Sequence, residues 1–243
     1  MARADEVAAD DLEPISQFCD SNRVELLIAR CRIEDIATTH ALGAAGFALM
    51  DTLVYYQRDL TALATQALQP GLIESLGTGD AQQVVAIARE CFTEYSGHYH
   101  ADPRLDRVAC REAYASWAQA CCDHTDDGSF VLVAGDRENR TGFSCFRRSS
   151  ESEGELLLGG VRAEARGRGL YTQLTLTGMN RLKAAGATRF LTSTHLGNWS
   201  AQAAWTAAGL HPYRAYHTFH RWFDGTAAAS RTGTEDSTSS LTA

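Results

Sequence analysis

The chain has 243 residues, of which 22 are basic and 30 acidic, so its formal net charge is −8. This length suffices for one good core, or about one and a half domains of ordinary size. The acidic balance disfavours a general nucleic-acid binder, because such a protein would carry a basic excess.

The cysteines and the apolar runs suggest where the protein works. The seven cysteines include no Cys-x-x-Cys pair, and an odd count without metal-ligand spacing is typical of reduced thiols. The N-terminus lacks a basic-then-apolar signal pattern, and no apolar run reaches the roughly 18 to 20 residues that a membrane helix requires. We therefore expect a cytoplasmic protein that uses no metal and binds neither membranes nor nucleic acid.

The first 70 residues predict a small α/β domain. Its expected elements are a strand at 24–28, a helix from an Asp35 cap to Ala45, and a strand at 48–56. Gly46 is placed to end the helix. Pro70-Gly71 punctuates the chain, so we expect a domain boundary between them.

Residues 71–223 predict a longer and more regular alternation of helices and strands. The expected elements are a strand at 72–76, a helix capped by Asp80, a ring-rich loop at 95–103, a helix at 105–121, a hairpin of strands at 130–134 and 142–146, a strand ending at Val161, a helix from Leu170 to Ala185, a strand at 190–194, a helix at 198–208 and a strand at 213–223. Residues 224–243 are rich in Ala, Ser, Thr and Gly, and we expect a disordered tail there.

The sequence also suggests an internal repeat with an offset of 163 residues. At this offset, Ala44-Ala45-Gly46-Phe47 aligns with Ala207-Ala208-Gly209-Leu210, and Asp35 aligns with Asn198. We hypothesise that the N-terminal segment copies the strand, helix and strand that close the second domain. The alternative is chance similarity in an alanine-rich sequence.

The stretch from Glu155 to Tyr171 predicts an anion-binding loop. An apolar strand ending at Val161 is followed by a loop with Gly167 and Gly169, and then by a helix. Glycine lets the backbone turn sharply and approach a ligand closely. Free N–H groups at the helix start, the helix dipole and the side chains of Arg162, Arg166 and Arg168 would then face one incoming group. A phosphate or pyrophosphate suits such a site.

Two common phosphate motifs fit this loop poorly. A P-loop requires Gly-Lys-Ser or Gly-Lys-Thr, which is absent, and the dinucleotide fingerprint requires a third glycine where Thr172 stands. What remains is Arg166-Gly-Arg-Gly169-Leu-Tyr171, followed by Asn198-x-x-Ala201-x-x-x-Trp205-x-x-x-Gly209-Leu210. Together these stretches resemble the R-x-x-G-x-G/A and Asn-x-x-Ala-x-x-x-Tyr-x-x-x-Gly-Phe motifs of the GNAT superfamily of acyl-CoA-dependent N-acetyltransferases.

The resemblance covers residues 71–223, and a weaker one extends further. The N-terminal segment and His100-Ala-Asp-Pro-Arg-Leu105 look like the corresponding parts of TDP-fucosamine acetyltransferase and its relatives. The implied fold is α+β: a central mixed, mostly antiparallel sheet flanked by helices, preceded by a smaller α/β N-terminal domain. The implied domains are a partial GNAT-like domain at 1–70 and the acetyltransferase domain at 71–223.

The resemblance also implies which residues would bind acetyl-CoA. The strand would pair with the amide-bearing pantetheine arm as an added strand does, the loop would bind the pyrophosphate, and a helix-start asparagine would contact the coenzyme near its thioester. The implied cofactor-binding residues are Leu158, Gly159, Val161, Arg166, Gly167, Arg168, Gly169, Leu170, Tyr171 and Asn198. Acetyl-CoA would be a co-substrate.

The catalytic residues follow less directly, because Trp205 stands where the family carries a tyrosine acid. An indole N–H is a poor proton donor to a thiolate, so we name Trp205 and Tyr213 as the catalytic candidates, with Tyr171, His211 and Tyr216 as further possible acids. His98, Tyr99 and His100 are candidates for substrate binding. His98, His100, Glu155 and His195 are candidate bases, although each could equally be a solvated or capping residue.

The expected function is transfer of an acetyl group from acetyl-CoA to a small-molecule primary amine. The resemblance favours a TDP-linked 4-amino-6-deoxy sugar as the acceptor and leaves room for a homodimer. One alternative keeps the coenzyme and changes the acceptor to an antibiotic, a polyamine or a protein amine. Another is a non-catalytic acyl-CoA-binding module.

Overall fold

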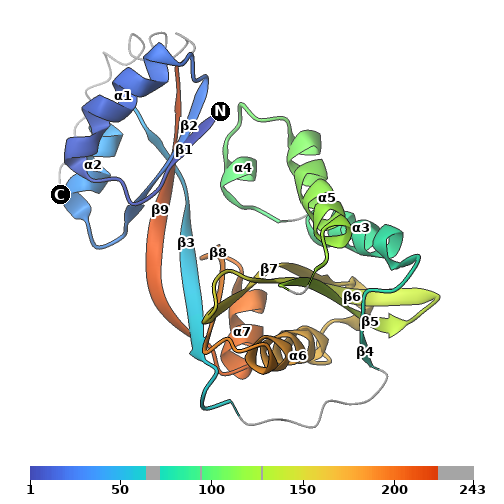
Figure 1. Ribbon diagram of the computed structural model, residues 1–243. Helices are drawn as coiled ribbons and strands as arrows, with labels where there is room; N and C mark the ends of the chain where they lie inside the picture. The colour runs from blue at the N-terminus through green and yellow to red at the C-terminus, as the bar shows by residue number, and fades with distance from the viewer. Residues whose placement is uncertain (64–71, 94, 127, 224–243) are drawn as a thin grey trace, which may run out of the picture. The chain divides into compact units, whose positions relative to one another are not determined.

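The computed structural model describes residues 1–63, 72–93, 95–126 and 128–223, which fall into two compact units (Figure 1). Unit 1 comprises residues 1–49 together with the chain from His217, and unit 2 comprises Met50–Tyr216. The predicted boundary at residues 70 and 71 and the predicted tail at 224–243 lie outside the described residues.

Unit 2 is built on a mixed sheet covered by helices on both faces. Its elements are the later part of β3 (Ala48–Asp59), β4 (Ile73–Ser75), α3 (Asp80–Cys91), α4 (His98–Ala101), α5 (Arg107–Asp123), β5 (Ser129–Asp136), β6 (Asn139–Arg148), β7 (Glu153–Val161), a 3-10 turn (Ala163–Ala165), α6 (Leu170–Ala184), β8 (Arg189–His195), α7 (Trp199–Ala207) and the start of β9 (His211–Trp222). The strand order is β9-β3-β8-β7-β6-β5-β4, and β7–β8 is a parallel pair among antiparallel ones. The predicted α+β class and mixed sheet are confirmed.

The two faces of this sheet carry separate cores because side chains alternate along each strand. On β6, Phe143 packs with α3 and α5, whereas Phe146 packs on the opposite face with α6. Gly178 of α6 allows this second contact, because a Cβ there would lie 2.2 Å from the Phe146 ring. Figure 1 shows α3 and α5 on one side of the sheet and α6 and α7 on the other.

Two local features of unit 2 differ from the sequence predictions. Asp80 does not cap α3: the N-cap is Gly79, and the buried carboxylate of Asp80 instead accepts hydrogen bonds from Arg140 and from the Gly77 N–H. The segment 95–103, predicted as a loop, contains the short helix α4.

Unit 1 has its own smaller core. Its elements are β1 (Ala2–Ala4), a 3-10 turn (Ala9–Asp11), α1 (Leu12–Ser21), β2 (Leu26–Arg32), α2 (Ile36–Ala44), the start of β3 and the end of β9. Apolar side chains of these elements pack together, among them Leu27, Leu42 and Phe219. The strand order is β1-β2-β9, and β1 and β2 are parallel.

The secondary structure supports the internal repeat. The bounds of β2, α2 and β3 match those of β8, α7 and β9, each shifted by 163 residues. The caps match as well: Asp35 and Asn198 each accept a hydrogen bond from the N–H three residues later. Gly46 and Gly209 both follow their helix in the left-handed conformation, with φ of 82° and 77°.

Each copy of the repeat gives its last strand to the other unit. The strand that ends the first copy, β3, pairs with β8 in unit 2 over seven residues from Leu53 to Asp59. The strand that ends the second copy, β9, neighbours β2 in unit 1, where the Phe223 N–H donates to the Glu25 carbonyl over 2.9 Å. In both arrangements the first strand of a copy, β2 or β8, lies between a parallel partner and an exchanged strand.

Candidate active site

The site is organised around the point where β7 and β8 separate. Their parallel pairing is confined to Glu153–Glu155 opposite Arg189–Leu191 in the part of the chain that the structure describes. At the next step, the Thr192 hydroxyl donates to the Leu156 carbonyl over 3.2 Å, so a side chain replaces a ladder bond. At the same level, Leu157 of β7 is an extra residue opposite Cys145 and Phe146 of β6, and this bulge bends β7. Beyond it, the β8-facing edge of β7 is available to an extended, amide-bearing ligand.

The loop after β7 places two glycines just before α6. Gly167 and Gly169 have φ of 75° and 71°, a left-handed conformation that L side chains rarely adopt. Gly169 is the N-cap of α6, and no side chain of the described residues caps this helix. Among the described residues, the backbone N–H groups from Gly167 to Thr172 have no acceptor. They form the positive end of the α6 dipole and suit a phosphate group.

The three loop arginines do not act alike. Arg162 forms an ion pair with Glu90 at 2.7 Å, and Arg166 donates to the Val161 carbonyl at 3.0 Å. Arg168 is exposed and has no ion-pair or hydrogen-bond partner within the described ranges. The predicted convergence of all three on one anion is therefore not present in this structure, and only Arg168 has an uncommitted guanidinium.

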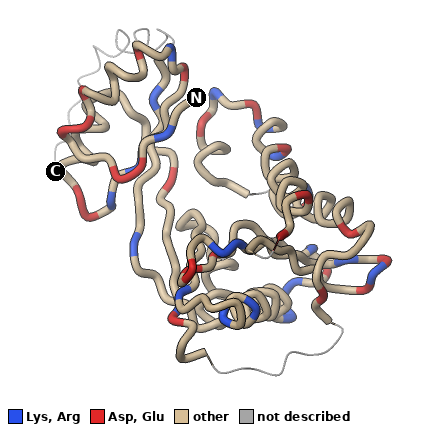
Figure 2. Tube along the Cα trace, in the orientation of Figure 1, with Lys and Arg blue, Asp and Glu red and all other residues tan. Residues whose placement is uncertain are grey.

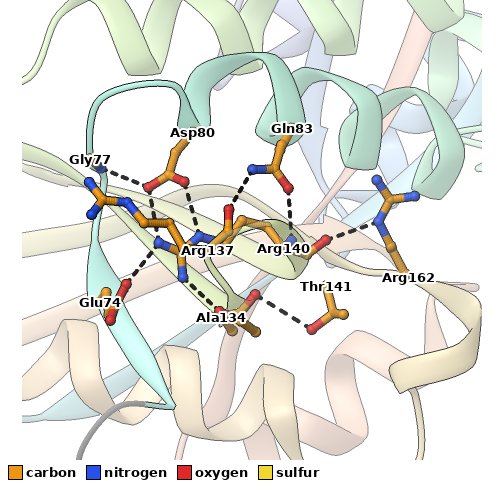
Figure 3. Close-up of polar contacts among 10 residues, drawn as sticks. Glu74, Gly77, Asp80, Gln83, Ala134, Arg137, Arg140, Thr141 and Arg162 are labelled. Atoms are coloured by element: carbon orange, nitrogen blue, oxygen red, sulfur yellow. Dashed lines mark hydrogen bonds and ion pairs between the residues drawn. The ribbon is translucent and has the colours of Figure 1, made fainter.

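A buried charge network holds the start of the loop (Figure 3). Arg140, which is 2% exposed, donates to Asp80 over 3.0 Å and to Glu74 over 2.7 Å, and its backbone N–H donates to Gln83. The Arg140 carbonyl accepts a hydrogen bond from Arg162. Burial raises the pKa of Asp80, but the hydrogen bonds from Arg140 and Gly77 outweigh it, so the pKa of Asp80 lies below its ordinary value. The network fixes α3 and Arg162 to the sheet.

The residues predicted to bind the coenzyme along β7 have mixed environments. Leu158 belongs to the core beneath α3 and α5. Gly159 lies under the Tyr171 ring, and Leu170 begins α6 and packs against the opposite core. The Val161 carbonyl also accepts from the Cys91 thiol at 3.4 Å in addition to Arg166. Cys91 and Arg166 thus shield the end of the strand, while its middle is left for a ligand.

Asn198 joins α7 to the separating strands. Its side-chain oxygen caps α7 by accepting from the Ala201 N–H, and its side-chain nitrogen donates to the Thr194 hydroxyl over 2.9 Å. The Thr194 hydroxyl also lies 3.4 Å from the Tyr95 hydroxyl. Both polar atoms of the Asn198 side chain are therefore already engaged, and a coenzyme contact would have to share them. In this structure Asn198 positions Thr194 and the start of α7.

The two catalytic candidates lie in different places. Trp205 is 2% exposed in the core beneath the separating strands, where its ring centroid lies 5.5 Å from that of Tyr56. Tyr213 lies beside Arg189 at the beginning of β8. Because β8 runs from Arg189 to His195, its two ends are about 20 Å apart. Tyr213 lies near the first of these ends, whereas Asn198 follows the second.

The alternative acids and bases are spread along β8. His211 lies beside Gln57, and the Tyr216 ring packs against Tyr55. Glu155 forms an ion pair with Arg147. His195, in contrast, ends β8 at the separation and packs edge-on to Tyr95, with ring centroids 4.8 Å apart.

A cluster of rings and charges faces this end of β8 from α4 and α5. The rings of His98 and Tyr99 are in tilted contact, whereas His100 stacks on Tyr114 and lies edge-on to Tyr95. Both ring nitrogens of His100 are buried and lack a partner within the described residues. Burial and the charges of Arg111 and Arg107 lower the pKa of His100, and burial lowers that of His195, so both imidazoles are neutral at neutral pH. They are suitable acceptors for a proton.

Asp51 and Tyr95 are site residues that the sequence analysis did not select. A buried oxygen of Asp51 has no partner among the described residues, and the Asp51 charge acts on His195, Tyr95 and Tyr114. Asp51 comes from β3, the exchanged strand, so only the three-dimensional pairing brings it here. Tyr95 belongs to the ring-rich segment 95–103, but the sequence does not indicate that its hydroxyl lies near that of Thr194.

Figure 2 shows acidic and basic residues interspersed along the described chain. None of the described helices combines the length and apolar character needed to cross a membrane. No group of three or more His, Cys, Asp or Glu side chains within the described ranges could hold a metal ion.

Comparison with solved structures identifies the fold as that of GCN5-related N-acetyltransferases. One similar structure is a GCN5-related N-acetyltransferase from Sphaerobacter thermophilus, with a TM-score of 0.62, 14% identity, and coverage of 87% of this chain and 66% of that chain. Another is a tandem GNAT protein from the clavulanic acid biosynthesis pathway, with a TM-score of 0.58, 15% identity, and coverage of 87% and 68%. The chain thus spans about two thirds of each protein.

A further similar structure contains a bound acyl-CoA. It is the N-myristoyltransferase of Saccharomyces cerevisiae with myristoyl-CoA, with a TM-score of 0.51, 12% identity, and coverage of 86% of this chain and 54% of that chain. No protein-family model and no curated protein matches the sequence. At these identities the comparisons establish the fold, and activity has to be argued from the site.

Proposed function

We propose that the protein is an acyl-CoA-dependent N-acetyltransferase that moves an acetyl group from acetyl-CoA to a primary amine. The observation that carries this proposal is the continuity of the separated edge of β7 with the open N–H groups between Gly167 and Thr172. The edge offers backbone partners to the pantetheine amides, and the α6 start offers donors to the pyrophosphate. A thioester held in this way would lie beside the Tyr95, Thr194 and His195 group.

The chemistry is aminolysis of the thioester. The amine nitrogen attacks the carbonyl carbon, the C–S bond breaks, and the thiolate of CoA takes a proton. Most of the acceleration would come from holding the two reactants together. Neutral His195 or His100 would accept the proton of the incoming ammonium, directly or through water.

The acceptor is proposed to approach from the cluster formed by Asp51, Tyr95, His100, Tyr114 and His195. The Asp51 carboxylate and the aromatic faces suit a cationic amine before it loses its proton. The N-terminal resemblance supports a TDP-linked 4-amino-6-deoxy sugar as the favoured acceptor, with an antibiotic, a polyamine or a protein amine as the alternatives. We further propose a cytoplasmic location.

The coenzyme part is tested by calorimetric titration with CoA. The Arg168→Ala variant is expected to weaken CoA binding by roughly 1 to 3 kcal/mol, as for other hydrogen bonds to charged groups, because Arg168 is the uncommitted arginine of the loop. Arg32→Ala, which removes an exposed arginine from unit 1, serves as the matched control and should leave CoA affinity unchanged. Equal affinities of the wild type and Arg168→Ala would remove Arg168 from the site, and absence of CoA binding by the wild type would reject the function.

The acceptor part is tested by thiol release from acetyl-CoA with a panel of TDP-amino sugars, aminoglycosides and polyamines. A non-catalytic acyl-CoA-binding module is the second candidate, because Trp205 occupies the position of the expected acid. CoA binding without thiol release for any amine would favour that second candidate.

A further inference from the structure

Two residues depart from the GNAT motifs: Tyr171 stands where the first motif has glycine or alanine, and Trp205 stands where the second has tyrosine. Tyr171 lies in the first turn of α6, and Trp205 lies near the end of α7. The Thr172 hydroxyl donates to the Ala204 carbonyl over 3.3 Å, which fixes the start of α6 against α7. The Trp205 side chain acts on the Tyr171 hydroxyl group, so the two side chains lie close together. Figure 1 shows α6 and α7 on the same side of the sheet.

The Tyr171 ring lies against the part of β7 that has separated from β8. A Cβ added to Gly159 would come within 2.9 Å of the Tyr171 Cε2 atom and 2.7 Å of the Ser144 Oγ atom. Cε2 is adjacent to the ring carbon that bears the hydroxyl group. The phenol thus borders the stretch of β7 that would hold the thioester end of pantetheine.

The indole of Trp205 complements this phenol. Its Nε1 atom is buried and has no hydrogen-bond partner among the described residues. Burial raises the pKa of Tyr171, and the adjacent Trp205 N–H partly offsets this rise in the pKa because it stabilises the phenolate. An indole N–H can only donate a hydrogen bond. It can therefore support the phenolate oxygen while leaving the phenol proton free for transfer.

We propose that Tyr171 is the proton donor to the leaving thiolate and that Trp205 is a positioning residue that supports its phenolate. This inference rests on the proposed acetyltransferase function. The amine nitrogen bonds to the carbonyl carbon and gives up one proton to a histidine or water. As the C–S bond breaks, its electron pair stays on sulfur, which takes the proton of the Tyr171 hydroxyl. The phenolate then recovers a proton from solvent, so the balance is acetyl-CoA plus amine giving amide plus CoA.

Other phenols of unit 2 are less suited to this step. Tyr213 lies beside Arg189 at the far end of β8. The Tyr95 hydroxyl lies at the separation but is engaged with Thr194. Tyr95 is therefore the competing donor, and the experiment has to distinguish it from Tyr171.

The experiment compares steady-state kinetics of Tyr171→Phe, Tyr95→Phe and Tyr55→Phe. Tyr55 is a matched control because it lies on β3 with its ring against Tyr213 and Tyr216. Tyr171→Phe is expected to lower kcat by about 100-fold, at the low end for proton-transfer catalysis, while CoA affinity changes less than about 3-fold. Wild-type kcat in Tyr171→Phe, or a large loss of kcat in Tyr95→Phe alone, would overturn the proposal and leave the proposed function standing.

Moving the hydroxyl group from residue 171 to residue 205 distinguishes a catalytic role of Tyr171 from a purely structural one. Trp205→Tyr alone is expected not to raise kcat, because the native protein already has its acid and the variant loses the indole that supports the Tyr171 phenolate. When Trp205→Tyr is added to Tyr171→Phe, kcat should rise at least about 10-fold above that of Tyr171→Phe, because α7 then supplies the hydroxyl group. A large rise in kcat for Trp205→Tyr alone would show that the native protein lacks an acid and would refute the role of Tyr171.

A second measurement needs no acceptor. The thiol pKa of bound CoA can be followed through thiolate absorbance in the binary complex. A phenol that donates to the thiolate lowers this thiol pKa, so Tyr171→Phe should raise it by about one unit relative to the wild type, a tenfold change. Equal values would contradict the proposal even if no amine is turned over. Failure of the wild type to bind CoA would instead remove the proposed function, and with it the role of Tyr171.

Discussion

At the scale of single residues, the buried Asp80–Arg140 pair is the most consequential contact outside the reacting groups. Their side chains are 1% and 3% exposed, so neither charge has water to replace its partner. Removing one member of such a pair leaves the other charge buried and uncompensated. Because Arg140 also accepts a hydrogen bond from Arg162, the pair links core stability to the position of the coenzyme loop.

We predict that Asp80→Asn lowers the free energy of unfolding by about 3 to 5 kcal/mol, the range for a broken buried pair. The folded-state pKa of Asp80 is lowered, so its contribution is complete above the unfolded pKa of about 4 and is lost as pH falls through the folded pKa. Urea unfolding between pH 3 and 7 should therefore show wild type and variant converging toward acid pH. Glu74→Gln is the control, because Glu74 is half exposed; a pH-independent difference would contradict the assignment.

The residue scale is also where sequence-based prediction of the site was incomplete. The cradle glycines were predictable because a left-handed backbone conformation restricts residue type. Their neighbours Arg162 and Arg166 were not, because their partners Glu90 and Val161 are fixed by packing and not by spacing. Asp51 and Tyr95 were missed for the same reason.

At the scale of elements, the two copies of the repeated helix allow capping and catalysis to be separated. Asp35 caps α2 and Asn198 caps α7 with the same bond to the N–H three residues later. Only Asn198 also holds Thr194, next to the separation of β7 and β8. The copies therefore share a structural role and differ in proximity to the proposed thioester.

We predict that Asn198→Ala destabilises the protein by about 1 kcal/mol, the usual cost of a lost cap, and also reduces kcat for acetyl transfer. Asp35→Ala should destabilise the protein while leaving kcat near the wild-type value. Thermal unfolding and thiol release measured on both variants test this difference. Equal losses of kcat would mean that Asn198 contributes through stability alone.

Most element positions could be predicted from the sequence, since helix stops such as Gly46 and Gly209 have a local physical cause. The cap of α3 could not, because Asp80 satisfies the helix-start pattern yet is held one position later by Arg140, 60 residues away. The pairing of the strands was also beyond local patterns. The periodicity of residues 48–56 does not indicate that this strand pairs with β8.

At the scale of the whole molecule, the exchanged strands decide which fragments can fold. β3 contributes Val54 and Tyr56 to the core of unit 2 and pairs with β8 over seven residues. A fragment that begins at residue 71, where the sequence suggested a domain boundary, lacks this strand. Its unit 2 sheet would end at β8 with an exposed edge.

We predict that the fragment 71–223 aggregates or unfolds, whereas the fragment 50–223, which restores β3, is markedly more soluble and shows a cooperative thermal transition. Circular dichroism and sedimentation of the two fragments provide the test. A cooperative transition of the shorter fragment equal to that of the longer one would show that β3 is dispensable for unit 2.

The exchange of last strands also sets an order of events during synthesis. β2 is complete once residue 32 has left the ribosome, yet its neighbour β9 ends at Trp222. Nearly the whole chain must therefore emerge before the sheet of unit 1 can close, and the closing contact has a very large sequence separation. During translation the edge of β2 remains unpaired, which makes the nascent N-terminal segment a natural client for chaperones.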